Sequence, residues 1–312
     1  MIKAMLHSPL VRRARRTVEQ LRYGTSDVFL RNAPHGNALI KSTIQRQEAS
    51  AMGKIGDGEL AAVRAYLRFK DSAGRIAKTA PYRAMLSRAP GVYPDDYGTF
   101  HRWGELWTTQ VLPAMSHLGV WFNFNESHII KQCAPSAALF HSYGLEPYIF
   151  SEPWSEALAG KKVAVVSPFP KTIQKQYPLR ASIWQRNPRV LPDFDLITLK
   201  CPPHPLLVKP AFPDWFGALE DMKQRIQETR FDVLLVGAGA YSLPLCAYAR
   251  SLGKIGIHLG GNTQLLFGIY GKRWLVKTAS IDHRFFNEAW CYPLQEETPP
   301  NCTAIEDGGY WK

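Results

Sequence analysis

Short β-rich runs alternate with helical patterns over much of this chain, and this alternation restricts the fold more than any other feature. Five runs have the length and composition of strands: 119–124, 162–167, 195–199, 232–236 and 254–258. Helical patterns lie at 213–229, 241–252 and 263–270. Buried strands that alternate with helices build a mainly parallel sheet covered on both faces. We therefore predict an α/β, Rossmann-like fold.

The N-terminal part of the chain divides at about residue 37. A helical pattern over 38–47 leads into an extended segment at 51–55 and then into a second helical pattern at 59–69. The sequence contains no internal repeat and no low-complexity tract. Residues 37–312 are therefore predicted to form one domain, with residues 1–36 as an appended basic arm.

The composition is that of a folded cytoplasmic protein. Apolar residues make up 46% of the 312 positions and charged residues 21%, which fits a globular core and excludes a disordered chain. The five cysteines form neither a CxxC pair nor a disulfide-framework spacing, so a reducing compartment is expected. No stretch of 18 residues is apolar and uncharged, so no membrane span is expected.

The formal net charge of +12 suits a nucleic acid, an anionic membrane or a phosphorylated substrate. The densest basic run is Arg12, Arg13, Ala14, Arg15 and Arg16, which follows an apolar and basic stretch. This run can form an amphipathic helix on the inner face of the cytoplasmic membrane, or it can be a solvated basic terminus. No nucleic-acid-binding module is recognisable, so no nucleic-acid partner is predicted.

Ligands of parallel α/β sheets bind beyond the carboxyl ends of the strands, so the loops at those ends are the candidate sites. The first such loop contains Asp57 and Glu59, flanked by Gly56 and Gly58. Two carboxylates two positions apart lie on one side of an extended backbone and can face one Mg²⁺ or Mn²⁺ ion. The glycines would let a diphosphate approach closely. In the alternative interpretation, Asp57 caps the following helix and Glu59 interacts with the helix dipole.

A second candidate loop follows the strand at 232–236 and contains Gly237, Gly239 and Ser242. A hydrophobic strand that enters a glycine-rich turn and then a helix is typical of phosphate binding. Ser242 stands at the third glycine position of the nicotinamide fingerprint, and Gly260 and Gly261 lie where that fingerprint has an acid. The turn is therefore predicted to contact a nucleotide other than NAD, or to be a tight structural turn.

A third candidate loop follows the strand at 162–167. Ser167 and Thr172 supply hydroxyls, and Lys175 extends the polar surface, which suits a phosphate group. A solvated loop between strand and helix is the alternative.

Asp95 and Asp96 lie in a turn of the sequence Tyr-Pro-Asp-Asp-Tyr. One of them could act as a general base, although acids in turns are usually solvated. The sequence lacks the HExxH and GxSxG motifs, which disfavours zinc hydrolysis and acyl transfer.

The motif Gly56-Asp57-Gly58-Glu59, followed much later by the glycine pair of 236–239, resembles the GT-D type of bacterial glycosyltransferases. Further segments are similar to a branch found among polysaccharide biosynthesis proteins: 121–124, 146–154, 165–169 and 260–268. The resemblance covers the chain from about residue 37 to the end.

This resemblance implies a Rossmann-like fold of GT-D type and a glycosyltransferase, such as a hexosyltransferase, of bacterial surface polysaccharide biosynthesis. It implies a nucleoside diphosphate sugar donor, expected as a UDP-sugar, a glycan or lipid-linked glycan acceptor, and Mn²⁺ or Mg²⁺ held by Asp57 and Glu59. The other hypothesis is a non-catalytic nucleotide-binding component of a polysaccharide locus.

Overall fold

The structure is a computed structural model that describes residues 9–22, 33–276 and 283–312. Within these ranges seven strands form one sheet in the order β3-β2-β1-β7-β6-β4-β5. Every neighbouring pair is parallel. The strands are β1 (Ser50–Gly53), β2 (His117–Val120), β3 (Ala138–His141), β4 (Lys162–Ser167), β5 (Asp195–Lys200), β6 (Val233–Val236) and β7 (Ile255–His258). The parallel α/β fold predicted from the sequence is confirmed.

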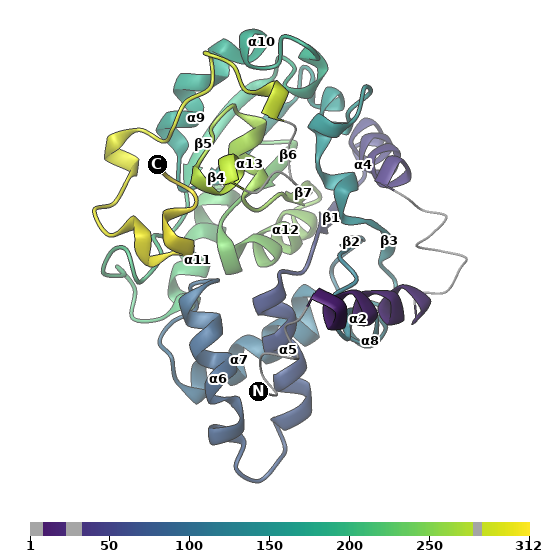
Figure 1. Cartoon of the computed structure of the whole chain (residues 1–312), viewed down its shortest axis with the longest axis vertical. Helices are drawn as coiled ribbons and strands as arrows, with labels where there is room; N and C mark the ends of the chain where they lie inside the picture. Colours follow the sequence, from purple (N-terminus) through teal and green to yellow (C-terminus); the bar gives the residue numbers. More distant parts are fainter. Residues whose placement is uncertain (1–8, 23–32, 277–282) are drawn as a thin grey trace.

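Helices lie on both faces of the sheet (Figure 1). Alternate residues of the central strands enter two separate hydrophobic cores. In β6, Leu234 and Val236 pack into the first core, while Val233 and Leu235 pack into the second. The helices of the first core are α5 (Asp57–Phe69), α6 (Arg75–Arg88), α7 (Tyr97–Leu106), α8 (Glu126–Cys133), α11 (Trp215–Gln227) and α12 (Ser242–Ser251). The helices of the second core are α4 (Ala33–Arg46), α9 (Pro170–Gln176), α10 (Arg180–Ile183), α13 (Asn262–Leu266) and α14 (Lys272–Val276).

The strands rich in β-branched residues match their predictions within two residues, and two other predicted elements differ for local backbone reasons. The strand predicted at 119–124 ends at Val120, because Phe122 and Asn125 have φ of 61° and 65° and turn the chain into α8. The helix predicted at 263–270 ends at Leu266, ahead of Gly268 at φ 67°. Positive φ is incompatible with continued strand or helix, so these residues mark the ends of the elements.

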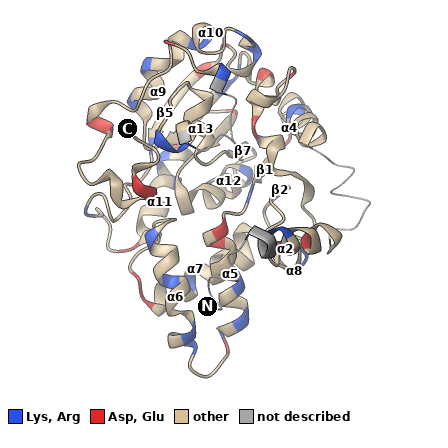
Figure 2. Cartoon of the chain, viewed as in Figure 1, with Lys and Arg blue, Asp and Glu red and all other residues tan. Residues whose placement is uncertain are grey.

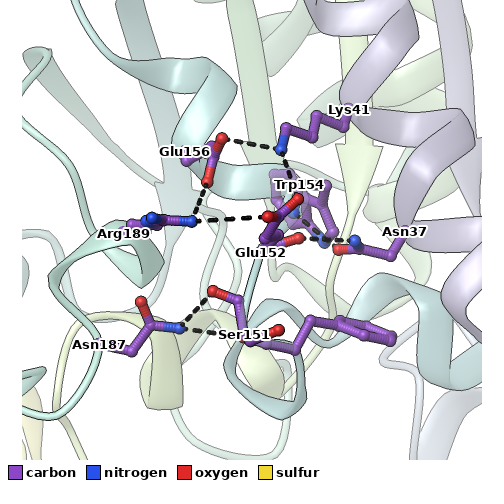
Figure 3. A network of polar contacts seen from close by, with 9 residues as sticks. Asn37, Lys41, Ser151, Glu152, Trp154, Glu156, Asn187 and Arg189 are labelled. Atoms are coloured by element: carbon purple, nitrogen blue, oxygen red, sulfur yellow. Dashed lines mark hydrogen bonds and ion pairs between the residues drawn. The ribbon is translucent and has the colours of Figure 1, made fainter.

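A polar network fixes α4 to the segment that follows β3 (Figure 3). The Asn37 side-chain amide donates to Glu152 O at 2.8 Å, and its carbonyl oxygen accepts from Trp154 N at 2.7 Å. Lys41 Nζ lies 2.7 Å from Glu156 Oε1. Helix α4 begins at Ala33, before the predicted boundary at residue 37, and Gly36 leaves room for the Phe140 ring.

The helix α2 (Pro9–Arg22) lies beside α8 and is bound to it through one buried carboxylate (Figure 1). Glu19 is 1% exposed and accepts from Asn125 N at 2.9 Å and from Ser127 Oγ at 2.7 Å. These groups lie at the first turn of α8, where backbone N–H groups have no partner inside the helix. Glu19 therefore acts as a cap supplied by another segment, and it holds the basic arm against the domain.

Basic residues are spread over several helices in the view of Figure 2, among them α5, α6 and α9. The side chains of Arg12, Arg15 and Arg16, and all of residues 1–8, lie outside the described part of the chain. None of the described helices is long and apolar enough to cross a bilayer.

Close packing of β7 against α12 predicts that Gly256→Ala is strongly destabilising. An added Cβ would lie 2.6 Å from Cys246 Cα and 2.8 Å from Cys246 O, both of them backbone atoms. Overpacking of this kind costs about 1–3 kcal/mol. Gly98→Ala is the control, because Gly98 is exposed in α7 and its added Cβ would meet only Asp96 Oδ1 at 3.3 Å. Equal urea unfolding free energies for the two variants would contradict this packing.

Candidate functional site

The candidate site lies where the central strand β1 ends and α5 begins (Figure 1). Strand β1 pairs with β2 on one side and with β7 on the other. After Gly53 the chain runs through residues 54–56 and enters α5 at Asp57. The two predicted metal-binding carboxylates, Asp57 and Glu59, lie at the carboxyl edge of the sheet, where ligands of such folds bind. Both are in the first turn of α5 and not on the extended backbone predicted from the sequence, and residues two apart in a helix do not face each other, so strand alternation does not place them on one side.

The N-cap of α5 is Gly56, with φ −68° and ψ 154°, and not Asp57. Asp57 is exposed, whereas Glu59 is partly buried and its carboxylate folds back over the Gly56 backbone. Any side chain at Gly56 would collide with the Glu59 carboxylate. The first glycine of the motif is therefore required for the position of Glu59.

Burial raises the pKa of Glu59 to about 7, and the negative charge of Asp57 adds to this shift. Glu126, the first residue of α8, is completely buried, and its pKa is also raised to about 7 by burial, with a smaller contribution from Asp57. Glu126 accepts backbone hydrogen bonds from Trp121 N and Asn123 N. The charge of Asp57 thus acts on both glutamates, and a cation at Asp57 and Glu59 would relieve the repulsion between these two.

The protein supplies few metal ligands at this position. In the described part of the chain, no group of three or more His, Cys, Asp or Glu side chains is arranged to hold a metal ion. Glu126 is engaged with the backbone, which leaves Asp57 and Glu59 as the oxygen donors. Such a pair suits a hard divalent cation that receives its other ligands from a substrate diphosphate and water, as Mg²⁺ usually does in phosphate-binding enzymes.

Charged side chains also occupy the other side of the β1 end. Lys54 Nζ lies 4.7 Å from the centre of the Trp121 ring, and burial lowers the pKa of this lysine. Glu146 is 3% exposed and accepts from Asn262 Nδ2 at 3.0 Å. Burial, and then the charge of Lys54, lower the pKa of His258 to about 3, so this imidazole is neutral at physiological pH.

Lys54, Glu126 and Glu146 are not among the site residues predicted from the sequence. Lys54 could have been found, since a lysine at the end of a buried strand interrupts an apolar run at the ligand-binding edge. Glu126 follows β2, whose end was predicted wrongly, and Glu146 follows β3, which was not predicted. No sequence signal therefore placed these two residues at the carboxyl edge of the sheet.

The glycine turn after β6 is filled by the protein itself. The amides of Gly237, Ala238 and Ala240 donate to Val166 O, Ser242 Oγ and Pro90 O at 2.9, 3.0 and 3.1 Å. A Cβ on Gly237 would lie 2.6 Å from Gly260 O, and one on Gly239 would lie 2.8 Å from Pro90 O. These three amides are therefore not available to a phosphate, and the glycines have a packing role.

The second glycine pair, Gly260 and Gly261, follows β7 and lies against the turn after β6. Gly260 has φ 61°, and a Cβ on Gly261 would lie 3.1 Å from both the Trp274 and Tyr310 rings. This close packing fixes α14 and the C-terminal segment against the end of β7.

The predicted hydroxyl groups after β4 face the protein interior. Ser167 Oγ accepts from Phe169 N at 3.1 Å. The Thr172 hydroxyl donates to the Glu297 carboxylate and accepts from Leu294 N. Lys175 is exposed on α9. Strand β4 is separated from β1 by β6 and β7, so these residues belong to another part of the sheet edge than Asp57 and Glu59.

The two turn carboxylates have different roles in the structure. Asp96 caps α7, since its Oδ1 accepts from Thr99 N at 2.7 Å. Asp95 Oδ1 lies 3.7 Å from Arg83 Nε, and the Asp95 side chain is 43% exposed. Of the two candidate general bases, Asp96 is therefore engaged in helix capping.

Comparisons with known proteins give little beyond the fold. No protein-family model matches the chain, and no curated protein gives a significant match. A solved structure described as a selenomethionine-substituted domain of unknown function 1792 is similar over 83% of this chain and 96% of its own. The two are 14% identical with a TM-score of 0.39, a likeness too weak to support any functional argument. The function must therefore be argued from this chain's own residues.

The turn after β6 is predicted to be structural. Ser242→Ala removes the acceptor of the buried Ala238 amide, and an unsatisfied buried donor costs about 1–3 kcal/mol of unfolding free energy. The folded variant should bind UDP with wild-type affinity, measured by calorimetry. A large loss of UDP affinity with unchanged stability would instead assign the turn to phosphate binding.

Proposed function

We propose that this protein is a metal-dependent glycosyltransferase that moves a sugar from a nucleoside diphosphate sugar, expected as a UDP-sugar, to a glycan or lipid-linked glycan acceptor. The observation that carries this proposal is the pair Asp57 and Glu59 at the carboxyl end of the central strand, with the pKa of Glu59 raised to about 7. The resemblance of this motif to GT-D enzymes supports the same activity. On this proposal the pathway is bacterial surface polysaccharide biosynthesis.

Asp57 and Glu59 would hold Mn²⁺ or Mg²⁺ together with the donor diphosphate. When bound, the cation stabilises the negative charge that develops on the leaving diphosphate. Gly56 leaves room for the carboxylate of Glu59, and Asp57 is exposed, so a donor in solution can reach it. Gly58 lies close to Pro90, whose ring would be 3.2 Å from an added Cβ. The protein's contribution is therefore mainly electrostatic and positional.

Asp95 is our candidate for the base that accepts the acceptor hydroxyl proton. Its side chain is half exposed and pairs loosely with Arg83, so it can rotate toward a substrate. The competing proposal is a nucleotide-binding component without activity. It requires the same fold, and only a measurement of sugar-transfer turnover distinguishes it from a glycosyltransferase.

We also propose that α2 contacts an anionic membrane that carries the lipid-linked acceptor. Ala14, Thr17, Val18 and Leu21 are all exposed and share one helix face by their spacing, while buried Glu19 anchors a different face to α8. Val18 is 47% exposed and Leu21 67%. An outward apolar face beside exposed Arg13 is typical of a helix that lies on a membrane surface.

Removal of either carboxylate of the motif should abolish metal-dependent turnover. Asp57→Asn and Glu59→Gln retain side-chain shape, and each should lower kcat/KM by about a hundredfold or more, because the bound cation contributes several kcal/mol to leaving-group stabilisation. Turnover is measured as UDP release from UDP-sugars with and without Mn²⁺.

Asp71→Asn is the control for these variants, since Asp71 is exposed after α5 and pairs with neighbouring Lys70. If the two motif carboxylates only stabilise α5, their variants would lose about 1 kcal/mol of unfolding free energy and retain activity. Binding of UDP that is unaffected by Mn²⁺, without turnover of any UDP-sugar, would favour the non-catalytic component.

Charges on the outward face of α2 should weaken membrane binding. The double variant Val18→Asp/Leu21→Asp should sediment much less with vesicles that contain phosphatidylglycerol. Ile76→Asp/Leu206→Asp is the matched control, because these two apolar residues are 59% and 43% exposed on other segments and the charge change is identical. Equal sedimentation of the two double variants would refute a specific role for α2.

A further inference from the structure

A partly buried lysine at the end of β1 has no anionic partner in contact. Within the described residues, no ion pair or hydrogen bond of Lys54 Nζ is found, and the ammonium group lies 4.7 Å from the centre of the Trp121 ring. The negative charge of Glu146 raises the pKa of Lys54 and so favours its charged form, and Glu146 Oε1 accepts from Asn262. Even partial removal of an ammonium group from water without an anion in contact is unfavourable, so such a lysine requires an explanation.

A second cation lies close enough to act on Lys54. Arg273 of α14 lowers the pKa of Lys54 through its positive charge, after the larger effect of burial. Its guanidinium stacks on Tyr310, 4.9 Å from the ring centre, and donates to Glu306 at 2.8 Å. The Gly261 turn packs against Tyr310 and Trp274 and thereby fixes α14 beside the carboxyl end of β7, next to β1. Two cations carried by separate elements therefore lie at the carboxyl ends of the neighbouring strands β1 and β7.

We propose that Lys54 and Arg273 form a phosphate-binding site on the side of β1 opposite to Asp57 and Glu59. Met52 packs into the second core, and Ala51 and Ile55 pack into the first, so alternation places Lys54 on the side of the second core. A phosphate between the two cations would relieve their repulsion. Arginine binds phosphate in a fixed planar geometry, and lysine adds a compact charge.

This inference rests on the proposed function, since it names the substrate group that the cations would hold. The group is either the diphosphate of the donor or the phosphate of a lipid-linked acceptor, and both present the same chemistry. Both groups of charges can act on one donor. In that case Asp57 and Glu59, with their cation, contact the diphosphate from one side of the β1 end, and Lys54 and Arg273 contact it from the other side.

The test is calorimetric titration of the full chain with UDP, with inorganic pyrophosphate and with a polyprenyl phosphate in detergent micelles, without added metal. Lys54→Met keeps the length of the side chain and removes its charge. This variant should bind pyrophosphate about tenfold more weakly or worse, the expected loss for a charged hydrogen bond. Its affinity for either UDP or the polyprenyl phosphate should fall by the same factor. Lys54→Arg should restore most of the affinity. The control is Lys162→Met, because Lys162 is exposed at the start of β4, at the opposite edge of the sheet.

The three ligands separate the sources. Weaker UDP binding in Lys54→Met assigns the site to the donor, and weaker polyprenyl phosphate binding with unchanged UDP binding assigns it to the acceptor. Wild-type affinity of Lys54→Met for all three ligands overturns the inference, and so does a wild-type protein that binds none of them. If pyrophosphate binding depends on Lys54 but no UDP-sugar is ever turned over, the proposed function fails and the phosphate site stands.

Folding is checked separately from binding. Lys54→Met removes the positive charge that lowers the pKa of Glu146, so the melting temperature can change for that reason alone. The double variant Lys54→Met/Glu146→Gln removes both charges. It should melt close to wild type and still bind pyrophosphate about tenfold more weakly or worse, which a purely structural lysine would not do.

Discussion

Burial of the parallel sheet on both faces is the constraint on which the rest of this structure depends. The central strands β1 and β6 are buried along their whole length, and β6 has the sequence Val-Leu-Leu-Val and contributes to both cores. In these central strands, charged side chains are accommodated only beyond the strand ends. The acids and bases of the candidate site therefore gather at the carboxyl edge, beside strands that cannot accommodate them.

The same constraint accounts for the shifted pKa values at this edge. Glu59, Glu126 and Glu146 all have raised pKa values, and burial is the largest cause for each. Burial likewise lowers the pKa values of Lys54 and His258. Desolvation disfavours the charged form of every one of these groups, so a bound ligand of opposite charge can restore the lost favourable interaction. Perturbed groups in one place are characteristic of functional sites, although buried networks of purely structural role also show them.

Sequence patterns predicted the architecture well because the strands in the second half of the chain are rich in β-branched residues and are flanked by charged residues. Strand β4 has the predicted bounds, and β5, β6 and β7 begin or end within one residue of theirs. Strand β3 was missed, since Ala138, Leu139, Phe140 and His141 are too few to show a period. The helices α6 to α9 were not predicted either, and α6 contains Pro81, which weakens a helical pattern.

The site was predicted less completely, because a spacing pattern finds residues that are close in sequence and misses those that the sheet brings together. The pair Asp57 and Glu59 lies in one helical turn, and the motif alone identified it. Glu146 follows β3, and Arg273 is carried by α14 after β7, so their nearness to Lys54 depends on the strand order. At the glycine turns the sequence left two alternatives open, nucleotide contact and a tight structural turn, and the packing favours the second. The pattern around Gly237 is the one that phosphate-binding loops use, but here the space that the missing side chains leave is taken by Gly260, Thr263 and Pro90.

The positions of these two groups of charges suggest how a glycosyltransferase could use this edge. An acidic pair with a cation and a basic pair without one both attract phosphate, but they depend differently on conditions. The first requires a divalent ion and ionised carboxylates, and the second requires that Lys54 be protonated. Lys54 precedes Asp57 by three residues, and the alternation of Ala51, Met52 and Ile55 between the two cores places Lys54 on the side of the second core, whereas α5, which begins at Asp57, packs on the first. A single strand end can thus present opposite charges to two sides of one diphosphate. The lysine does not contact the carboxylates, so the two kinds of charge do not neutralise each other.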